Sequence, residues 1–151
     1  MNMVCCFFGH KDVPHDIKER LTAVLTELIA EGVDSFLVGN QGGFDSIVLN
    51  SLRMLKKKYP HITYNVVLAY MPGAKEEWPT YEPLETLYPE GLESVPPRYA
   101  ISWRNKWMIR ESDMAVTYIT HSWGGVAQFA ELAEKKMKRV INIASMMNTK
   151  N

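Results

Sequence analysis

The stretch "THSWGGVAQFAELAEKKMKRVINI", from Thr120 to Ile143, contains a repeating unit of an alternating α/β fold. A polar turn with the glycine pair Gly124 and Gly125 follows an apolar segment and precedes residues with helical spacing. The apolar run 140–143 then predicts a strand. Two glycines at such a junction either allow a tight turn or bring the backbone close to a ligand.

The same alternation extends toward the N-terminus. Apolar runs predict five strands, over residues 4–8, 35–38, 63–69, 113–119 and 140–143. Helical spacing is found over residues 17–31, 44–58, 98–112 and 124–137. This order predicts right-handed crossovers and a mainly parallel five-stranded sheet covered on both faces, in a single α/β domain over residues 1–151.

Residues 70–97 interrupt the pattern. They hold six of the eight prolines, together with Trp78, Tyr81 and Tyr88. Long connections in compact domains are often lids or binding loops. Three interpretations stay open: an ordered surface excursion with aromatic anchors, a flap over a ligand, or a surface that binds another chain.

The balance of charge guides the choice of partners. The 17 basic and 17 acidic residues cancel, so we expect no nucleic-acid partner, because phosphate-backbone binding usually needs a basic excess. No apolar stretch approaches the ~20 residues that span a bilayer, and no secretory signal is visible. The sequence therefore predicts a cytoplasmic protein without a membrane partner.

The two cysteines, Cys5 and Cys6, are neighbours in a predicted strand. Adjacent strand residues point to opposite faces, so these thiols are poor partners for a disulfide. We expect both to be buried and reduced. No cysteine–histidine spacing typical of a metal site occurs, and no metal is predicted.

Three turns follow predicted parallel strands, at residues 9–12, 39–45 and 120–125. Ligands of open α/β sheets bind at this edge, and glycines before a helix expose amides to an anion such as phosphate. The alternative is that the glycines only permit tight turns. The predicted ligand-binding residues are Gly9, His10, Gly39, Asn40, Gln41, Gly42, Gly43, Asp45, His121, Ser122, Gly124, Gly125 and Gln128.

The glutamate at position 131 lies off the apolar stripe of its helix. Glu131 is therefore either a solvated side chain or is covered by a ligand or a second subunit.

The dinucleotide fingerprint GxGxxG and the P-loop GxxxxGK[ST] are both absent, which argues against typical dehydrogenases and P-loop NTPases.

Two segments contain motifs of known type: "GGVAQFAE" (124–131) is similar to PGGxGTxxE, and "RNKWMIRESD" (104–113) is similar to RKxxMxxxAD. In these motifs the chain resembles the LOG family, the cytokinin-activating phosphoribohydrolases. The motifs' lysine, proline, third glycine and threonine are replaced by Asn105, Trp123, Ala127 and Gln128. "CCFFGHKDVP" (5–14) and "FLVGNQGGFD" (36–45) resemble the YpsA-like, DUF1273-type branch of the wider SLOG superfamily.

This resemblance implies a Rossmann-like three-layer sandwich that binds a nucleotide or a nucleotide-derived molecule, without a further cofactor. It also implies an alternative, in which Arg104 and Glu131 cleave the N-glycosidic bond of a nucleoside 5′-monophosphate. The altered motif favours binding over turnover. LOG relatives form dimers, so we expect a homodimer or a higher homo-oligomer.

Overall fold

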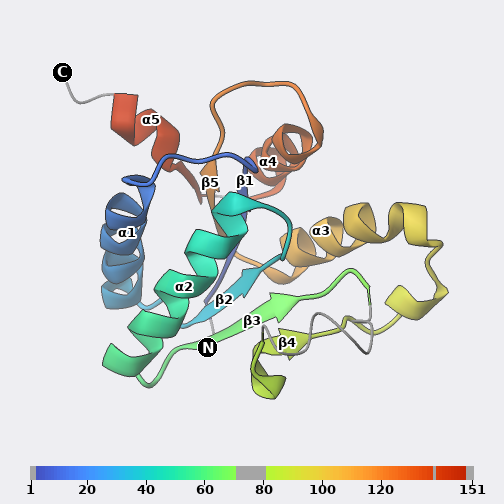
Figure 1. The fold of residues 1–151 in the computed structure, drawn as a ribbon, viewed down its shortest axis with the longest axis horizontal. Coiled ribbons are helices and arrows are strands. Elements are labelled where there is room, and N and C mark those ends of the chain that lie inside the picture. The colour runs from blue at the N-terminus through green and yellow to red at the C-terminus, as the bar shows by residue number, and fades with distance from the viewer. Residues whose placement is uncertain (1–2, 71–80, 138, 149–151) are drawn as a thin grey trace.

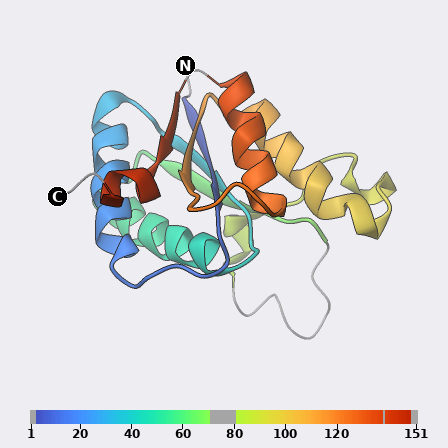
Figure 2. The same ribbon diagram turned by 90° about the horizontal axis from the view of Figure 1, so that it is seen from above.

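A computed structural model describes residues 3–70, 81–137 and 139–148. It shows a six-stranded sheet with the strand order β4-β3-β2-β1-β5-β6, covered by helices on both faces (Figures 1 and 2). All neighbouring strands are parallel. The predicted Rossmann-like three-layer sandwich is therefore confirmed.

The strands are β1 (Val4–Gly9), β2 (Ser35–Val38), β3 (Thr63–Val67), β4 (Thr86–Leu87), β5 (Met114–Tyr118) and β6 (Arg139–Asn142). The predicted number of five strands is wrong by one. The additional strand, β4, lies inside the proline-rich segment and pairs with the end of β3. Two residues are too short a run for an apolar pattern to mark them as a strand.

Over the described residues, five α-helices and three 3-10 helices accompany the sheet. They are α1 (Ile17–Glu31), α2 (Gly43–Lys58), α3 (Ala100–Glu111), α4 (Gly125–Lys136), α5 (Ile143–Asn148), η2 (Pro83–Glu85), η3 (Leu92–Ser94) and η4 (Pro97–Tyr99). Helices α1, α2 and α5 cover one face of the sheet, and α3 and α4 cover the other (Figure 2).

The central strand β1 supplies side chains to both cores. Cys5 and Phe7 pack with α1, α2 and α5, whereas Cys6 and Phe8 pack with α3 and α4. Both thiols are free and buried, as predicted. Burial raises the pKa of the Cys6 thiol to about 12, so this residue is an inert core side chain.

The described part of the proline-rich segment is fixed to the domain by an ionic cluster. Arg53 donates two hydrogen bonds of 2.7 Å to the carboxylate of Glu85, and the Tyr64 hydroxyl donates a third of 2.6 Å. These donors lower the pKa of Glu85 to about 2. The start of the described part, residues 81–97, is therefore attached to the domain, and the interpretation of the whole segment 70–97 stays a prediction. The remainder of the predicted flap, with Trp78, lies outside the described residues.

Candidate functional site

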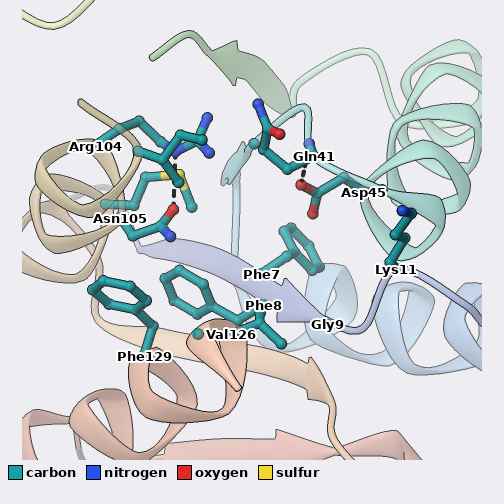
Figure 3. A pocket seen from close by; sticks show the side chains of 15 residues that line it. Phe7, Phe8, Gly9, Lys11, Gln41, Asp45, Arg104, Asn105, Val126 and Phe129 are labelled. Atoms are coloured by element: carbon teal, nitrogen blue, oxygen red, sulfur yellow. Dashed lines mark hydrogen bonds between the residues drawn. The ribbon is translucent and has the colours of Figure 1, made fainter. Parts of the chain in front are cut away.

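A pocket of about 440 Å³ opens where β1 and β2 end (Figure 3). Helices α2, α3 and α4 border it, so it occupies the edge at which open α/β sheets bind ligands. Its lining comprises Phe7, Phe8, Gly9, Lys11, Gly39, Gln41, Gly42, Asp45, Ile101, Arg104, Asn105, Met108, Gly125, Val126 and Phe129. The volume lies within the range of small-molecule sites.

One side of the pocket is apolar and carries two aromatic rings. The rings of Phe8 and Phe129 stack with their centroids 6.3 Å apart and an angle of 22° between their planes. Val126 of α4 also contributes to the lining (Figure 3). So does Met108 of α3. Such a wall suits a flat ring, for example a nucleobase.

A buried arginine forms part of the α3 side. Arg104 is 1% exposed and donates hydrogen bonds to the Val67 carbonyl (2.7 Å), the Asn40 side-chain oxygen (3.3 Å) and the Asn105 side-chain oxygen (2.9 Å). Burial lowers the pKa of this guanidinium, and the nearby Asp45 opposes that shift. Arg104 thus holds the ends of β2 and β3 together, while part of it borders the pocket.

Asp45 lies on the opposite side, near Gln41 and Lys11 (Figure 3). Its carboxylate accepts the Gln41 backbone N–H at 2.9 Å. Burial raises the pKa of Asp45 to about 6, against the effects of the Gln41 amide and of Arg104. The pocket therefore contains a carboxyl group that titrates near neutral pH.

The turn before α2 is closed by its own chain. The N–H groups of Gly43 and Phe44, at the start of α2, donate to the carbonyls of Lys11 (2.8 Å) and His10 (3.3 Å). A methyl group on Gly43 would overlap the Lys11 carbonyl oxygen. The glycines here permit close packing of two turns, and these two amides are not available to an anion. The contacts of these two donors are those of a tight turn, and the role of Gly43 in ligand binding stays a prediction.

The turn before α4 is open. No side chain caps this helix, and within the described chain the amides of Gly125, Val126 and Ala127 have no hydrogen-bond partner. A methyl group added to Gly124 or Gly125 would meet no atom within 4 Å. Gly124 has φ of 100°, which requires glycine, but Gly125 has no such backbone restraint. The free amides and the positive end of the helix dipole therefore border the pocket at Gly125.

Three aromatic rings form a column beside this turn. His10 stacks on His121 with centroids 4.0 Å apart, and His121 stacks on Trp123 at 3.6 Å. His10 is buried and its Nε2 accepts the Thr120 N–H at 3.0 Å, so its remaining proton is on Nδ1. Burial, together with His121, lowers the pKa of His10. The column is therefore assembled with His10 neutral.

The pocket brings together only part of the predicted ligand-binding set. Its lining includes Gly9, Gly39, Gln41, Gly42, Asp45 and Gly125. It does not include His10, Asn40, Gly43, His121, Ser122, Gly124 and Gln128. Of these, Asn40 and Gly43 line a neighbouring cavity of about 510 Å³ on the other side of the turn before α2.

The predicted catalytic pair is not assembled in the described part of this chain. Arg104 lines the pocket, but Glu131 is exposed on α4 and does not belong to the lining. The solvated interpretation of Glu131 fits the single chain. The carboxylate that lines the pocket together with Arg104 belongs to Asp45.

Sequence reasoning missed the apolar wall and two polar side chains, Lys11 and Asn105. Lys11 lies inside a turn that the sequence already placed at this edge, and Asn105 follows Arg104 directly. The phenylalanines gave no separate signal, because a core ring and a pocket ring have the same pattern in a sequence.

Neither metal sites nor membrane helices are found in the residues that the structure describes. No group of three or more histidine, cysteine, aspartate or glutamate side chains is placed to hold a metal ion there. Over the same residues, no helix has both the length and the apolar character needed to cross a bilayer.

A parallel α/β sheet with a ligand-sized pocket at its carboxyl edge defines a Rossmann-like domain. The family model YpsA, described as the YspA SLOG family, matches residues 2–149. The chain therefore belongs to this SLOG family, and the resemblance stated from the sequence is confirmed. Membership suggests nucleotide-related binding. No curated protein matches the chain.

Among solved structures, the chain is similar to DNA processing protein A from Helicobacter pylori, which binds single-stranded DNA. The TM-score is 0.58 at 17% sequence identity, and the match covers 91% of this chain. The chain spans less than two thirds of that protein, since the match covers 63% of it. At this identity the likeness concerns the fold.

The exclusion of nucleic acid as a partner is wrong. A neighbour with this fold binds single-stranded DNA, so the inference from zero net charge does not hold. Net charge averages over the whole chain, whereas unpaired strands are bound through local grooves and through stacking of bases on aromatic rings. The predicted homo-oligomer and the cytoplasmic location stay predictions.

Proposed function

We propose that the pocket at the carboxyl edge binds a nucleotide or a nucleotide-derived molecule, such as a nucleoside phosphate or an ADP-ribose-like compound. The observation that carries this proposal is the open turn before α4. Its free amides border the pocket at Gly125, on the helix that also supplies Phe129 to the apolar wall. An anion and a flat ring therefore find complementary surfaces on one element.

The remaining polar groups suit the middle of such a ligand. Asp45 and Asn105 lie on opposite sides of the pocket (Figure 3) and are suited to hydrogen bonds with ribose hydroxyls or with the edge of a base. Lys11 adds a cation to the lining. The charge pattern favours a ligand with a small number of phosphates, because the pocket lining contains two basic side chains and one acidic side chain.

Isothermal titration calorimetry against adenosine mono-, di- and triphosphate and ADP-ribose tests the proposal. We expect saturable binding of at least one of them. Gly125→Ala places a methyl group in the space next to the free amides without a clash inside the protein. This variant should weaken binding by about ten-fold or more, which is roughly 1.4 kcal/mol.

Glu134→Ala is the matched control, since it introduces the same residue at an exposed position of α4 outside the pocket. It should leave the affinity unchanged. No heat with any of the four ligands, or equal affinities of the Gly125→Ala variant and the unmodified protein, would contradict the proposal.

The second candidate is a LOG-like phosphoribohydrolase. The position of Arg104 in the lining favours it, and the carboxylate available in the pocket is Asp45 rather than Glu131. Release of free base from nucleoside 5′-monophosphates, followed by chromatography, tests this activity. Release that persists in Glu131→Ala and stops in Asp45→Asn would establish it with Asp45 in the role expected for Glu131.

A further inference from the structure

The column of His10, His121 and Trp123 ends at the exposed indole of Trp123, which packs against no core cluster of the described residues. Trp123 is 71% exposed, compared with 52% for Tyr99 and 46% for Tyr70, the other exposed large aromatic side chains among the described residues. It belongs to none of the hydrophobic clusters of this part of the chain. Burial of apolar surface therefore does not explain an indole at this position.

The column is nevertheless held in a defined geometry. The planes of His10 and His121 differ by 17°, and those of His121 and Trp123 by 14°. His121 Nδ1–H donates to the Trp123 carbonyl at 2.9 Å, and His10 is anchored through the Thr120 amide. An exposed ring that is already ordered loses little conformational entropy when another flat group stacks on it.

We propose that this column is a stacking platform for an unpaired nucleobase, which lies on the outer face of Trp123. An indole with a free face offers the sequence-tolerant contact that proteins use for unpaired bases. The rings of the platform lie outside the pocket lining. The inference shares with the proposed function the free amides of the turn before α4, and the experiment below separates the two.

The surroundings of Trp123 favour a base over an apolar segment of another protein. The next residues lead directly into the open turn, where the amides of Gly125, Val126 and Ala127 are free within the described chain. A nucleotide carries a phosphate beside its base, and these donors complement it. An aliphatic or proline-rich segment would offer these amides only neutral carbonyl oxygens, which the positive end of the helix attracts less than it attracts a phosphate.

The base could belong to a free nucleotide or to a single strand. Two probes with the same base, thymine, distinguish these sources. Affinities are measured at low salt for a fluorescent single-stranded oligothymidylate by anisotropy, and for thymidine monophosphate by calorimetry. The proteins are the unmodified chain, Trp123→Ala, Trp123→Phe and the control Tyr99→Ala, which removes an exposed aromatic ring outside the column. Circular dichroism checks that each variant is folded.

We expect Trp123→Ala to weaken binding by about ten-fold, with Trp123→Phe retaining most of the affinity and Tyr99→Ala all of it. A loss with the oligonucleotide alone assigns the platform to single strands, and a loss with both probes assigns it to nucleotides as well. Binding of both probes by Trp123→Ala as tightly as by the unmodified chain overturns the proposal. The proposal is also overturned if neither the oligonucleotide nor thymidine monophosphate binds to the unmodified chain.

Failure of this inference and failure of the proposed pocket function are distinguishable. Adenine nucleotide binding that responds to Gly125→Ala but not to Trp123→Ala supports the pocket alone. Oligonucleotide binding that responds to Trp123→Ala, without any mononucleotide binding, supports the platform alone.

Discussion

The two turns before α2 and α4, at the carboxyl edge of the sheet, share a glycine pair and a positive φ at its first glycine, but they have different surroundings. In the turn before α2, the first amides of the helix are bonded to the carbonyls of His10 and Lys11. In the turn before α4, the first amides are free within the described chain, and the space around Gly125 is empty. A glycine pair before a helix can therefore serve internal packing or leave donors exposed, and only the neighbouring chain decides which.

The largest effect that tests this comparison is expected for Gly43→Ala. The new methyl group would overlap the Lys11 carbonyl oxygen, so the two turns must separate. Overpacking of this kind should lower the free energy of unfolding by about 3 kcal/mol. Chemical denaturation measures this change, and a variant as stable as the unmodified protein would show that the turn before α2 is not closed.

Asp45 makes the stability of the closed turn depend on pH. Its pKa is raised from 3.8 to about 6, so between these values the folded protein retains a proton that the unfolded chain has lost. The free energy of unfolding therefore falls as the pH rises from 3.8 to about 6, and this loss of stability persists at higher pH. Asp45→Asn should therefore gain on the order of 2 kcal/mol relative to the unmodified protein between about pH 4 and pH 7.

Denaturation of both proteins at several pH values measures this difference. The titration of His10 has the opposite sign, since its pKa is lowered, but it occurs in both proteins and cancels in the comparison. Parallel stability profiles of the two proteins would show that Asp45 is not buried in its charged form.

Gly124→Ala tests the backbone of the open turn. With φ of 100° and ψ of 165°, this position is restricted to glycine, and alanine should cost about 2 kcal/mol of stability. Since no atom lies within 4 Å of the added methyl group, the cost is conformational rather than steric. Thermal denaturation measures it, and a negligible change would mean that the turn adopts another conformation.

The smallest effect on stability is expected for Gly125→Ala, with the opposite sign. The position is helical and the added methyl group has free space, so alanine should stabilise the protein by about 0.5 to 1 kcal/mol. The same variant is expected to bind nucleotide more weakly. Improved stability together with reduced affinity would assign Gly125 to the ligand rather than to the fold, whereas a loss of stability would contradict this assignment.

The sequence was sufficient for the architecture and for the edge that carries the pocket. Apolar runs marked five of the six strands, and their order with the helices fixed the parallel sheet. Strand β4 escaped because its two residues lie among prolines and are positioned by pairing with β3, a contact distant in sequence.

The sequence was less informative about the site itself. It predicted an anion site at both glycine turns and could not distinguish the closed turn from the open one. The hydrogen bond from Gly43 N–H to the Lys11 carbonyl, which closes one of them, joins residues distant in sequence and leaves no local pattern. It gave Arg104 and Glu131 one joint role, although Arg104 is buried and Glu131 is exposed. Helical periodicity predicts which residues lie on the same face of a helix, but not which neighbouring element contacts that face.

The cluster of Arg53, Tyr64 and Glu85 has a consequence for the outer margin of the sheet. With its folded pKa lowered from 4.5 to about 2, Glu85 contributes stability above pH 4.5 that is lost only as the pH falls toward 2. The cluster thus keeps the two-residue β4 attached to β3 over the whole physiological range. So short an outermost strand offers few unpaired backbone groups to another molecule, which disfavours polymerisation through strand addition.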